Sequence, residues 1–271
     1  MAVLPRLVEL YAKRGYEVAT GLFPPTFGNF AEAAFTWLLH KGRPTTGNLG
    51  IALQEVYFLE CLLAEWQPQR IFVVGNSFGW STLALALICP QARVVALDAC
   101  MTPDTHAGLV LTNLIAAEER LNAIAVRGVS PQDVDQVVRT RLEGAIDLAL
   151  IDGHHTNDAV LADFRAIRPF LAPAQVTLFH DVQAFRLHEG VRAAVAESGL
   201  AAQLLLGTPS GMVALADPAH PPPGVAAALR AFAPSGEALQ ALASERERRQ
   251  LAAQKASRGT DAAAGSTRGV R

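Results

Sequence analysis

The sequence predicts a doubly wound α/β fold, in which a mostly parallel sheet is covered by helices on both faces. Short apolar segments alternate with helical patterns from residue 70 to residue 197, as in repeated strand–helix units. These segments are apolar throughout rather than alternating, so we expect strands that are buried on both faces. The chain has 271 residues, 51% of them hydrophobic, which is enough to bury a core of this kind.

Each element of this fold is predicted from a local pattern. The final two strands are separated only by the turn Gly207–Gly211, which is a hairpin signal, so the last strand should run antiparallel. Strands are predicted at 70–74, 93–97, 123–127, 146–151, 176–179, 202–206 and 212–216. Helices are predicted at 81–89, 106–121, 131–141, 157–171 and 189–197.

The segments on either side of this core are predicted to be appendages. Apolar residues at three- and four-residue spacing favour helices over 29–40 and 51–66, joined by a loop at 41–48. After residue 217 the composition changes, and three prolines at 221–223 mark a boundary. The predicted parts are an N-terminal helical cap or lid at 1–66, a cofactor-binding core at 67–217, and a tail at 218–271 with a polar helix over 237–255 and disorder over 256–271.

Charge and cysteine content narrow the functional classes. A net charge of −2 with 18% charged residues gives no electrostatic reason to expect nucleic acid or an anionic membrane as a partner. Cys61, Cys89 and Cys100 have neither the number nor the spacing of a disulfide framework or a metal site. The N-terminus lacks a secretory pattern. We therefore expect a cytoplasmic protein with a small-molecule partner, and leave open a homo-oligomer.

A glycine-containing turn after the first strand is the first candidate for cofactor binding. Its Gly-x-x-x-Gly spacing differs from the dinucleotide pattern Gly-x-Gly-x-x-Gly, and it lacks the lysine of a P-loop. Glycines let the backbone turn tightly and approach a ligand closely, although two glycines alone are also compatible with a plain strand-to-helix connection. The candidate cofactor-binding residues here are Gly75, Asn76, Ser77, Gly79 and Ser81.

The next two strand ends add further candidates. Asp98 ends the second strand about 20 residues after Gly79, where a carboxylate can accept hydrogen bonds from ribose hydroxyls. An isolated aspartate of this kind is as often a helix cap. Ser130 follows the third strand, where an adenine ring would reach, but Ser130 and Pro131 also form a good helix start. Turn and acid together favour a nucleoside-containing cofactor.

Carboxylates and histidines follow the fourth and fifth strands. Asp152 and His155 come after the fourth strand, and His180 and Asp181 after the fifth. Because the carboxyl ends of parallel strands meet at one edge of the sheet, we expect these four residues to converge. Such a cluster can ligate a divalent cation or transfer protons, although each residue alone also has a structural interpretation.

Two runs of sequence resemble class I methyltransferases of the cephalosporin-hydroxylase and sugar O-methyltransferase type. They are Val73-Val-Gly-Asn-Ser-Phe-Gly-Trp-Ser-Thr-Leu83 and Ile146-Asp-Leu-Ala-Leu-Ile-Asp-Gly-His-His155, the second followed by His180-Asp-Val182. The resemblance covers about residues 45–216 and implies a Rossmann-like sheet of seven strands with a reversed last strand. The sequence departs from the family pattern at Val73, where an acid is usual.

The resemblance also implies roles for the candidate residues. Gly75, Gly79 and Asp98 would hold S-adenosylmethionine, with Asp152 beside it. Magnesium, if it binds, would be held by Asp152 and Asp181, with His180 as a third candidate ligand, and His155 would be the general base. The N-terminal aromatic residues would cover the methyl acceptor; they are Phe27, Phe30, Phe35 and Trp37.

The leading hypothesis is therefore S-adenosylmethionine-dependent methyl transfer to a hydroxyl oxygen of a small molecule. A nicotinamide-dependent oxidoreductase is one alternative; the acid after the second strand favours it, but the missing Gly-x-Gly-x-x-Gly opposes it. A non-catalytic cofactor-binding module of the same fold is the other. Such a module would not need the cluster of Asp152, His155 and Asp181.

Overall fold

A computed structural model describes residues 2–28, 31–45 and 49–266, with side chains up to residue 253. Contacts between residues divide the chain into two compact units, residues 1–233 and residues 234–271. The larger unit includes the N-terminal segment, the predicted core and the first part of the predicted tail. Within the described residues, none of the helices has the length and apolar character needed to cross a membrane.

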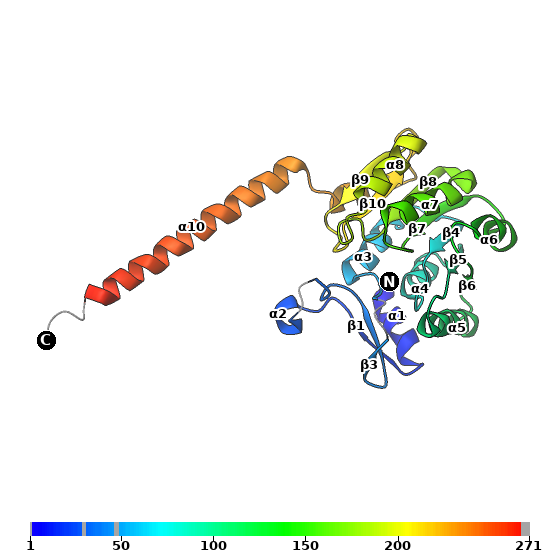
Figure 1. Ribbon diagram of the computed structural model, residues 1–271, viewed down its shortest axis with the longest axis horizontal. Coiled ribbons are helices and arrows are strands. Elements are labelled where there is room, and N and C mark those ends of the chain that lie inside the picture. Colours follow the sequence, from blue (N-terminus) through cyan, green and yellow to red (C-terminus); the bar gives the residue numbers. More distant parts are fainter. Residues whose placement is uncertain (1, 29–30, 46–48, 267–271) are drawn as a thin grey trace. The chain divides into compact units, whose positions relative to one another are not determined.

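A seven-stranded sheet organises the larger unit (Figure 1), with the order β6-β5-β4-β7-β8-β10-β9. All neighbours from β6 to β8 are parallel, whereas β10 is antiparallel to both β8 and β9. This arrangement confirms the predicted fold and the reversed last strand. The strands are β4 Arg70–Val74, β5 Arg93–Asp98, β6 Ala123–Arg127, β7 Ile146–Ile151, β8 Leu171–Phe179, β9 Ala201–Leu205 and β10 Met212–Ala216.

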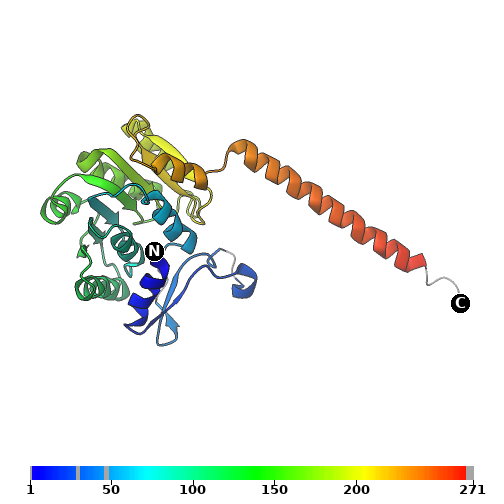
Figure 2. The same cartoon turned by 180° about the vertical axis from the view of Figure 1, so that it is seen from behind.

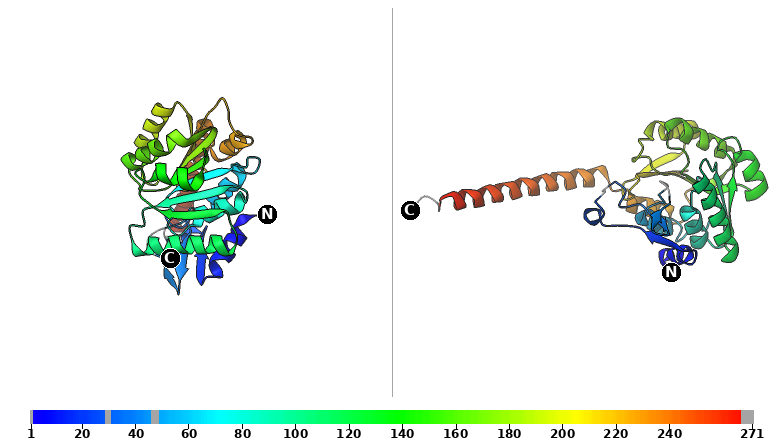
Figure 3. Two further views of the ribbon diagram at one scale, coloured as in Figure 1. Left: turned by 90° about the vertical axis from the view of Figure 1, so that its right-hand side faces the viewer. Right: turned by 60° about the horizontal axis from the view of Figure 1, so that its bottom comes forward.

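Two hydrophobic clusters, one on each face of the sheet, explain why the strands are apolar throughout. Ile71 and Val73 of β4 belong to the cluster that packs against α1, α3, α4 and α5, whereas Phe72 and Val74 belong to the cluster that packs against α6, α7 and α8. Figures 2 and 3 show the helices around the sheet from other sides. These helices are α4 Trp80–Ile88, α5 Pro103–Glu118, α6 Val134–Val137 with a π-helical turn Val138–Leu142, α7 Asn157–Ile167 with a 3-10 turn Arg168–Phe170, and α8 His188–Ser198.

The N-terminal segment differs from the helical cap that the sequence predicts, because it contains a small antiparallel sheet. The residues predicted as a helix over 29–40 instead supply β2, which pairs with β1 and β3, while residues 29–30 lie outside the described part. Lys41 and Gly42 both have positive φ, 52° and 71°, which suits a two-residue hairpin turn between β2 and β3. The segment consists of α1 Val3–Ala12, β1 Tyr16–Ala19, α2 Pro24–Phe27, β2 Trp37–His40, β3 Arg43–Pro44 and α3 Leu53–Leu62.

The C-terminal part contains two helices. Helix α9, Val225–Phe232, completes the larger unit and packs its Phe232 ring against Phe58, with ring centroids 5.0 Å apart. The smaller unit is one long helix, α10, Gly236–Ser266, drawn in orange and red in Figure 1. The predicted polar helix is therefore present and continues through residues 256–266, which were expected to be disordered; residues 267–271 lie outside the described part.

Candidate functional site

The glycine turn after β4 is shaped by close contact with neighbouring elements. Gly75 has φ of 94°, and a Cβ atom on it would lie 2.0 Å from the carbonyl oxygen of Asp152. Gly79 has φ of 80°, and its Cβ would lie 2.1 Å from Oγ1 of Thr112 on α5. Both positions therefore require glycine for conformation and for space. Helix α5 also approaches closely, since a Cβ on Gly108 would lie 2.3 Å from the carbonyl oxygen of Ser77.

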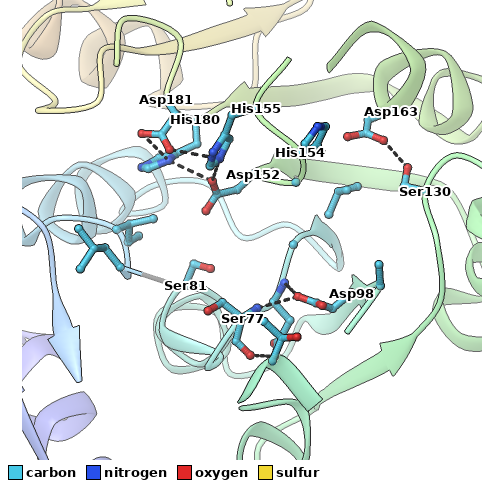
Figure 4. A pocket seen from close by; sticks show the side chains of 18 of the residues that line it. Ser77, Ser81, Asp98, Ser130, Asp152, His154, His155, Asp163, His180 and Asp181 are labelled. Atoms are coloured by element: carbon cyan, nitrogen blue, oxygen red, sulfur yellow. Dashed lines mark hydrogen bonds and ion pairs between the residues drawn. The ribbon is translucent and has the colours of Figure 1, made fainter. Parts of the chain in front are cut away.

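Asp98 holds this turn through its carboxylate (Figure 4). Its Oδ2 accepts hydrogen bonds from the backbone N–H groups of Asn76 and Ser77, both at 2.8 Å. Its Oδ1 accepts a third from Cys100 N–H at 2.7 Å. An ionised carboxylate offers about four acceptor positions, so one position of Asp98 is left for a ligand. The predicted acid therefore lies at the turn. Three of its acceptor positions stabilise the backbone, and one remains for a ligand.

The side chains of the turn differ in what they contribute. Asn76 is buried, with its amide bonded to Thr112 Oγ1 and its Oδ1 accepting from Thr82, both at 3.0 Å. Its side chain therefore stabilises the turn. The Ser77 hydroxyl is buried without a hydrogen-bond partner, and Ser81 lines the same cavity. Burying a hydroxyl without a hydrogen-bond partner costs free energy, so the state of the Ser77 hydroxyl favours a bound polar ligand.

The ends of β5 and β6 provide an apolar rim that sequence reasoning missed. Met101 and Val129 line the cavity although 84% and 45% of their surfaces are exposed. Ser130, next to Val129 in the chain, also lines the cavity, and its hydroxyl donates to Asp163 Oδ1 at 2.5 Å. Burial raises the pKa of Asp163 more than this hydrogen bond lowers it. Two exposed apolar side chains, on the loops after β5 and β6, give this part of the cavity an apolar surface that suits a flat ring.

The carboxylates and histidines of β7 and β8 converge as predicted (Figure 4). His155 Nε2 lies 3.5 Å from Asp152 Oδ1 and 3.2 Å from Asp181 Oδ2. Among the described residues, Asp152, His155 and Asp181 can each present one ligand atom with all three atoms within 4.8 Å of one another. The buried atoms His155 Nε2 and Asp181 Oδ1 lack aligned hydrogen-bond partners. The two carboxylates suit a hard divalent cation, whereas the imidazole is a less suitable ligand for such an ion.

His180 is also predicted as a metal ligand, but both nitrogens of its ring face carboxylates. Its Nδ1 lies 3.1 Å from Asp152 Oδ1, and its Nε2 lies 2.8 Å from Glu55 Oε2. Burial opposes protonation of His180, but Asp152 and Glu55 outweigh it and hold its pKa well above the usual value. A protonated imidazole has no lone pair for a metal, so this geometry favours a supporting role for His180.

The same contacts polarise the other members of the cluster. Burial opposes ionisation of Asp152, but His180 and His155 outweigh it and lower the pKa of Asp152 to about 2. Burial favours neutral His155, but the close contact and charge of Asp152, with the charge of Asp181, raise its pKa above the usual value. The cluster thus combines ionised carboxylates with an imidazole that takes up a proton readily.

Glu55 on α3 is a further residue that sequence reasoning missed, and it contacts the site through His180. It is fully buried, and its Oε2 accepts from Ala52 N–H at 2.8 Å while Oε1 accepts from Ser210 N–H at 3.0 Å. Burial raises its pKa, but His180 and these donors outweigh that effect, and the net pKa is lowered. The sequence does contain a signal for this residue: a single acidic residue among the apolar residues of the buried face of α3, which are Val56, Phe58, Leu59 and Leu62.

One cavity of about 970 Å³ connects the glycine turn with the carboxylate–histidine cluster. Its lining includes the predicted residues Gly75, Asn76, Ser77, Ser81, Asp98, Ser130, Asp152, His155, His180 and Asp181. Of the aromatic residues expected to cover an acceptor, Phe35 lines the cavity, whereas Phe27 and Trp37 pack on each other with centroids 6.0 Å apart. Phe30 lies outside the described residues.

Comparison with known families agrees with this geometry. Residues 72–182 match the family described as "Methyltransferase domain". Residues 72–182 thus form a methyltransferase domain. The match begins in β4 and ends just after the His180-Asp181 pair, so the methyltransferase domain contains both the glycine turn and the cluster. The match confirms the predicted family and gives no support to a nicotinamide-dependent oxidoreductase.

Solved structures share the fold of this methyltransferase domain. An O-methyltransferase from Bacillus cereus in complex with S-adenosylhomocysteine has 19% identity and a TM-score of 0.50, covering 62% of this chain and 82% of that one. The calicheamicin methyltransferase CalS11 has 17% identity and a TM-score of 0.50, with 60% and 79% covered. A Geobacter sulfurreducens methyltransferase has 16% identity and a TM-score of 0.50, with 62% and 79% covered. A search of curated protein sequences found no match.

The close contact at Gly75 leads to a prediction for the methyltransferase domain. In Gly75→Ala, the new Cβ would collide with the backbone of Asp152, and φ of 94° would be strained for alanine. We expect a loss of stability of about 1–3 kcal/mol or more, the cost of strained backbone, measured by urea unfolding. Gly28→Ala is the matched control, because Gly28 has φ of 80° with open space around it. Equal losses in both variants would show that the collision is unimportant.

Proposed function

We propose that this domain transfers the methyl group of S-adenosylmethionine to a hydroxyl oxygen of a small molecule. One observation carries the proposal: the turn held by Asp98 and the cluster of Asp152, His155 and Asp181 line the same cavity. A methyl donor at the turn would thus lie beside a group that can remove the acceptor proton. We also propose a cytoplasmic location, since Cys61, Cys89 and Cys100 are unpaired thiols.

The residues at the turn fit the donor. The remaining acceptor position of Asp98 suits a ribose hydroxyl. Met101 and Val129 would cover the faces of an adenine ring, which removes their exposed apolar surface from water. The unsatisfied hydroxyl of Ser77 and the Ser81 hydroxyl can bind the polar end of the molecule. Ser130 lies at the adenine side, where we expect it to act through its bond to Asp163.

The mechanism assigns proton removal to His155. When bound, S-adenosylmethionine supplies an electrophilic methyl group on a sulfonium. His155 Nε2 would take the proton from the acceptor hydroxyl and so free an oxygen lone pair for the methyl group, and the donor would leave as S-adenosylhomocysteine. The imidazolium that results is stabilised by Asp152 and Asp181, whose carboxylates lie 3.5 and 3.2 Å from Nε2. The cavity walls align the two reactants.

The same carboxylates are the proposed magnesium site. Asp152 and Asp181 would hold the ion, and a bound cation would orient the acceptor oxygen and lower the pKa of its hydroxyl. His180 would neutralise part of the charge of Asp152, since its ring lies between the carboxylates of Asp152 and Glu55.

Calorimetric titration with S-adenosylmethionine and S-adenosylhomocysteine tests the proposal. We expect both to bind, and Asp98→Ala to weaken binding at least about tenfold, because a charged hydrogen bond is worth about 1.5–3 kcal/mol. Asp158→Ala is the control, since Asp158 is an exposed carboxylate on α7. Thermal unfolding of each variant separates loss of binding from loss of fold. Failure of the wild-type protein to bind either ligand would reject the function.

The raised pKa of His155 predicts the pH dependence of turnover. Only neutral His155 accepts a proton, so kcat should rise with pH through the pKa of His155, which lies above the usual value of about 6.5. Measurement of kcat between pH 5.5 and 9 in about half-unit steps should show an ascending limb centred above that value. In His155→Ala, the residual rate should lack this limb. An ascending limb centred well below pH 6.5 would contradict His155 as the base.

A further inference from the structure

The cavity beside the carboxylate–histidine cluster has walls that can select the methyl acceptor. Its apolar lining comes from the N-terminal segment and from the turn after β8: Phe35, Leu38, Leu49, Ile51, Ala184 and Phe185. A volume of about 970 Å³ is at the upper end of the range for small-molecule sites, so donor and acceptor can be bound together.

Two aromatic rings stand beside the reactive groups. Phe185 stacks on His155, with centroids 4.3 Å apart and an interplanar angle of 29°. It nevertheless keeps 53% of its surface exposed, so much of the ring remains free for contact. Phe35 meets His180 edge to face, with centroids 6.3 Å apart. Aromatic rings favour stacked or edge-to-face contact with a further ring, so the groups around the base suit a planar acceptor.

The carboxylates of the cavity lining outnumber its basic side chains, which are the histidines His154, His155 and His180. Its carboxylates are Glu32, Asp98, Asp152, Asp163 and Asp181, and no lysine or arginine is among its described lining residues. The sequences of 29–30 and 46–48 contain no lysine or arginine either. Phosphate and carboxylate groups are normally bound by such cations. The imidazoles of His155 and His180 already face Asp152 and Asp181. An anionic acceptor would have to compete with these carboxylates for them and would be repelled by the carboxylates.

We infer that the methyl acceptor is an uncharged aromatic hydroxyl compound, and that the cavity discriminates against acceptors that carry phosphate or carboxylate groups. This inference rests on the proposed methyl transfer and specifies its substrate class. The apolar walls provide affinity for the ring. The absence of lysine and arginine from the described lining, together with the excess of carboxylates, provides the discrimination.

Three ring compounds that differ only in one remote substituent test the inference. They are 4-methylcatechol, 3,4-dihydroxybenzoate and 3,4-dihydroxybenzylamine, which are neutral, anionic and cationic, with methyl glucoside as a non-aromatic polyol. Each is titrated into the complex with S-adenosylhomocysteine, and kcat/KM is measured with S-adenosylmethionine, in one buffer containing magnesium. We expect 4-methylcatechol to exceed the benzoate by about tenfold or more in affinity and kcat/KM, and the glucoside to bind weakest.

Variants at Phe185 provide the matched control, because this residue is half exposed and its replacement is expected to leave the core packing unchanged. Phe185→Leu should weaken all three ring compounds alike. Phe185→Arg should shift the preference towards the benzoate by about tenfold relative to Phe185→Leu. The inference is overturned if the benzoate equals or exceeds 4-methylcatechol in the wild-type protein, or if S-adenosylhomocysteine binds but no ring compound does. Failure of S-adenosylhomocysteine itself to bind would reject the proposed function, and the inference with it.

Discussion

Replacement of His155 with alanine is expected to lower kcat by about 10²–10⁴-fold, the usual contribution of a general base. His155 is the member of the cluster whose buried Nε2 lacks a hydrogen-bond partner while two carboxylates lie within 3.5 Å of it. It can therefore accept a proton and hold it as an imidazolium. Alanine removes the acceptor but leaves Asp98 and the glycine turn unchanged, so the affinity for S-adenosylhomocysteine should stay within about threefold of the wild-type value.

The neighbouring histidine provides the control for this experiment. His154 lines the same cavity but is exposed and has no partner in the cluster among the described contacts. Steady-state kinetics of His154→Ala and His155→Ala, with calorimetry of S-adenosylhomocysteine binding, should show a large loss of kcat only in the second. A fall of less than about tenfold in His155→Ala would assign proton removal to another group.

The core of the fold could be predicted because its signals are local. Most strands of the large sheet contain an apolar run in the sequence, such as residues 148–151 of β7, and the polar residues that follow the run mark the carboxyl end of the strand. Parallel pairing then places Asp98, Asp152 and Asp181 at one edge. Even the departure at Val73 has a local explanation, since its side chain is buried in the core and does not line the cavity.

The remaining features depend on contacts between distant segments. Strand β2, Trp37–His40, is four residues long and gains its hydrogen bonds from β1 and β3, so its own pattern did not distinguish it from a helix. Glu55 is bonded to His180 and to Ser210, which lie 125 and 155 residues further along the chain. A buried glutamate shows that a partner exists without identifying it, and the choice of metal ligands therefore could not be refined from the sequence.

The buried Glu55–His180 pair leads to the largest expected effect on stability. Glu55→Ala removes a fully buried carboxylate that is bonded to His180 and to two backbone N–H groups. Breaking one partner of a buried ion pair typically costs about 3–5 kcal/mol, and we expect a loss of that order in the free energy of unfolding, measured by urea denaturation. Glu55→Gln keeps an acceptor for the N–H groups but loses the charge, so its loss should be smaller.

The pH dependence of this effect separates charge from packing. The pKa of Glu55 is lowered in the folded protein, so the stability gained from its ionisation is present above its ordinary pKa and is lost as pH falls through the folded value. The stability difference between the wild-type protein and Glu55→Gln should therefore be largest near neutral pH and shrink in acid. A difference that stays constant from pH 7 down to about pH 3 would mean that Glu55 stabilises the fold only through its shape and hydrogen bonds. The charge of Glu55 would then contribute nothing to its interaction with His180.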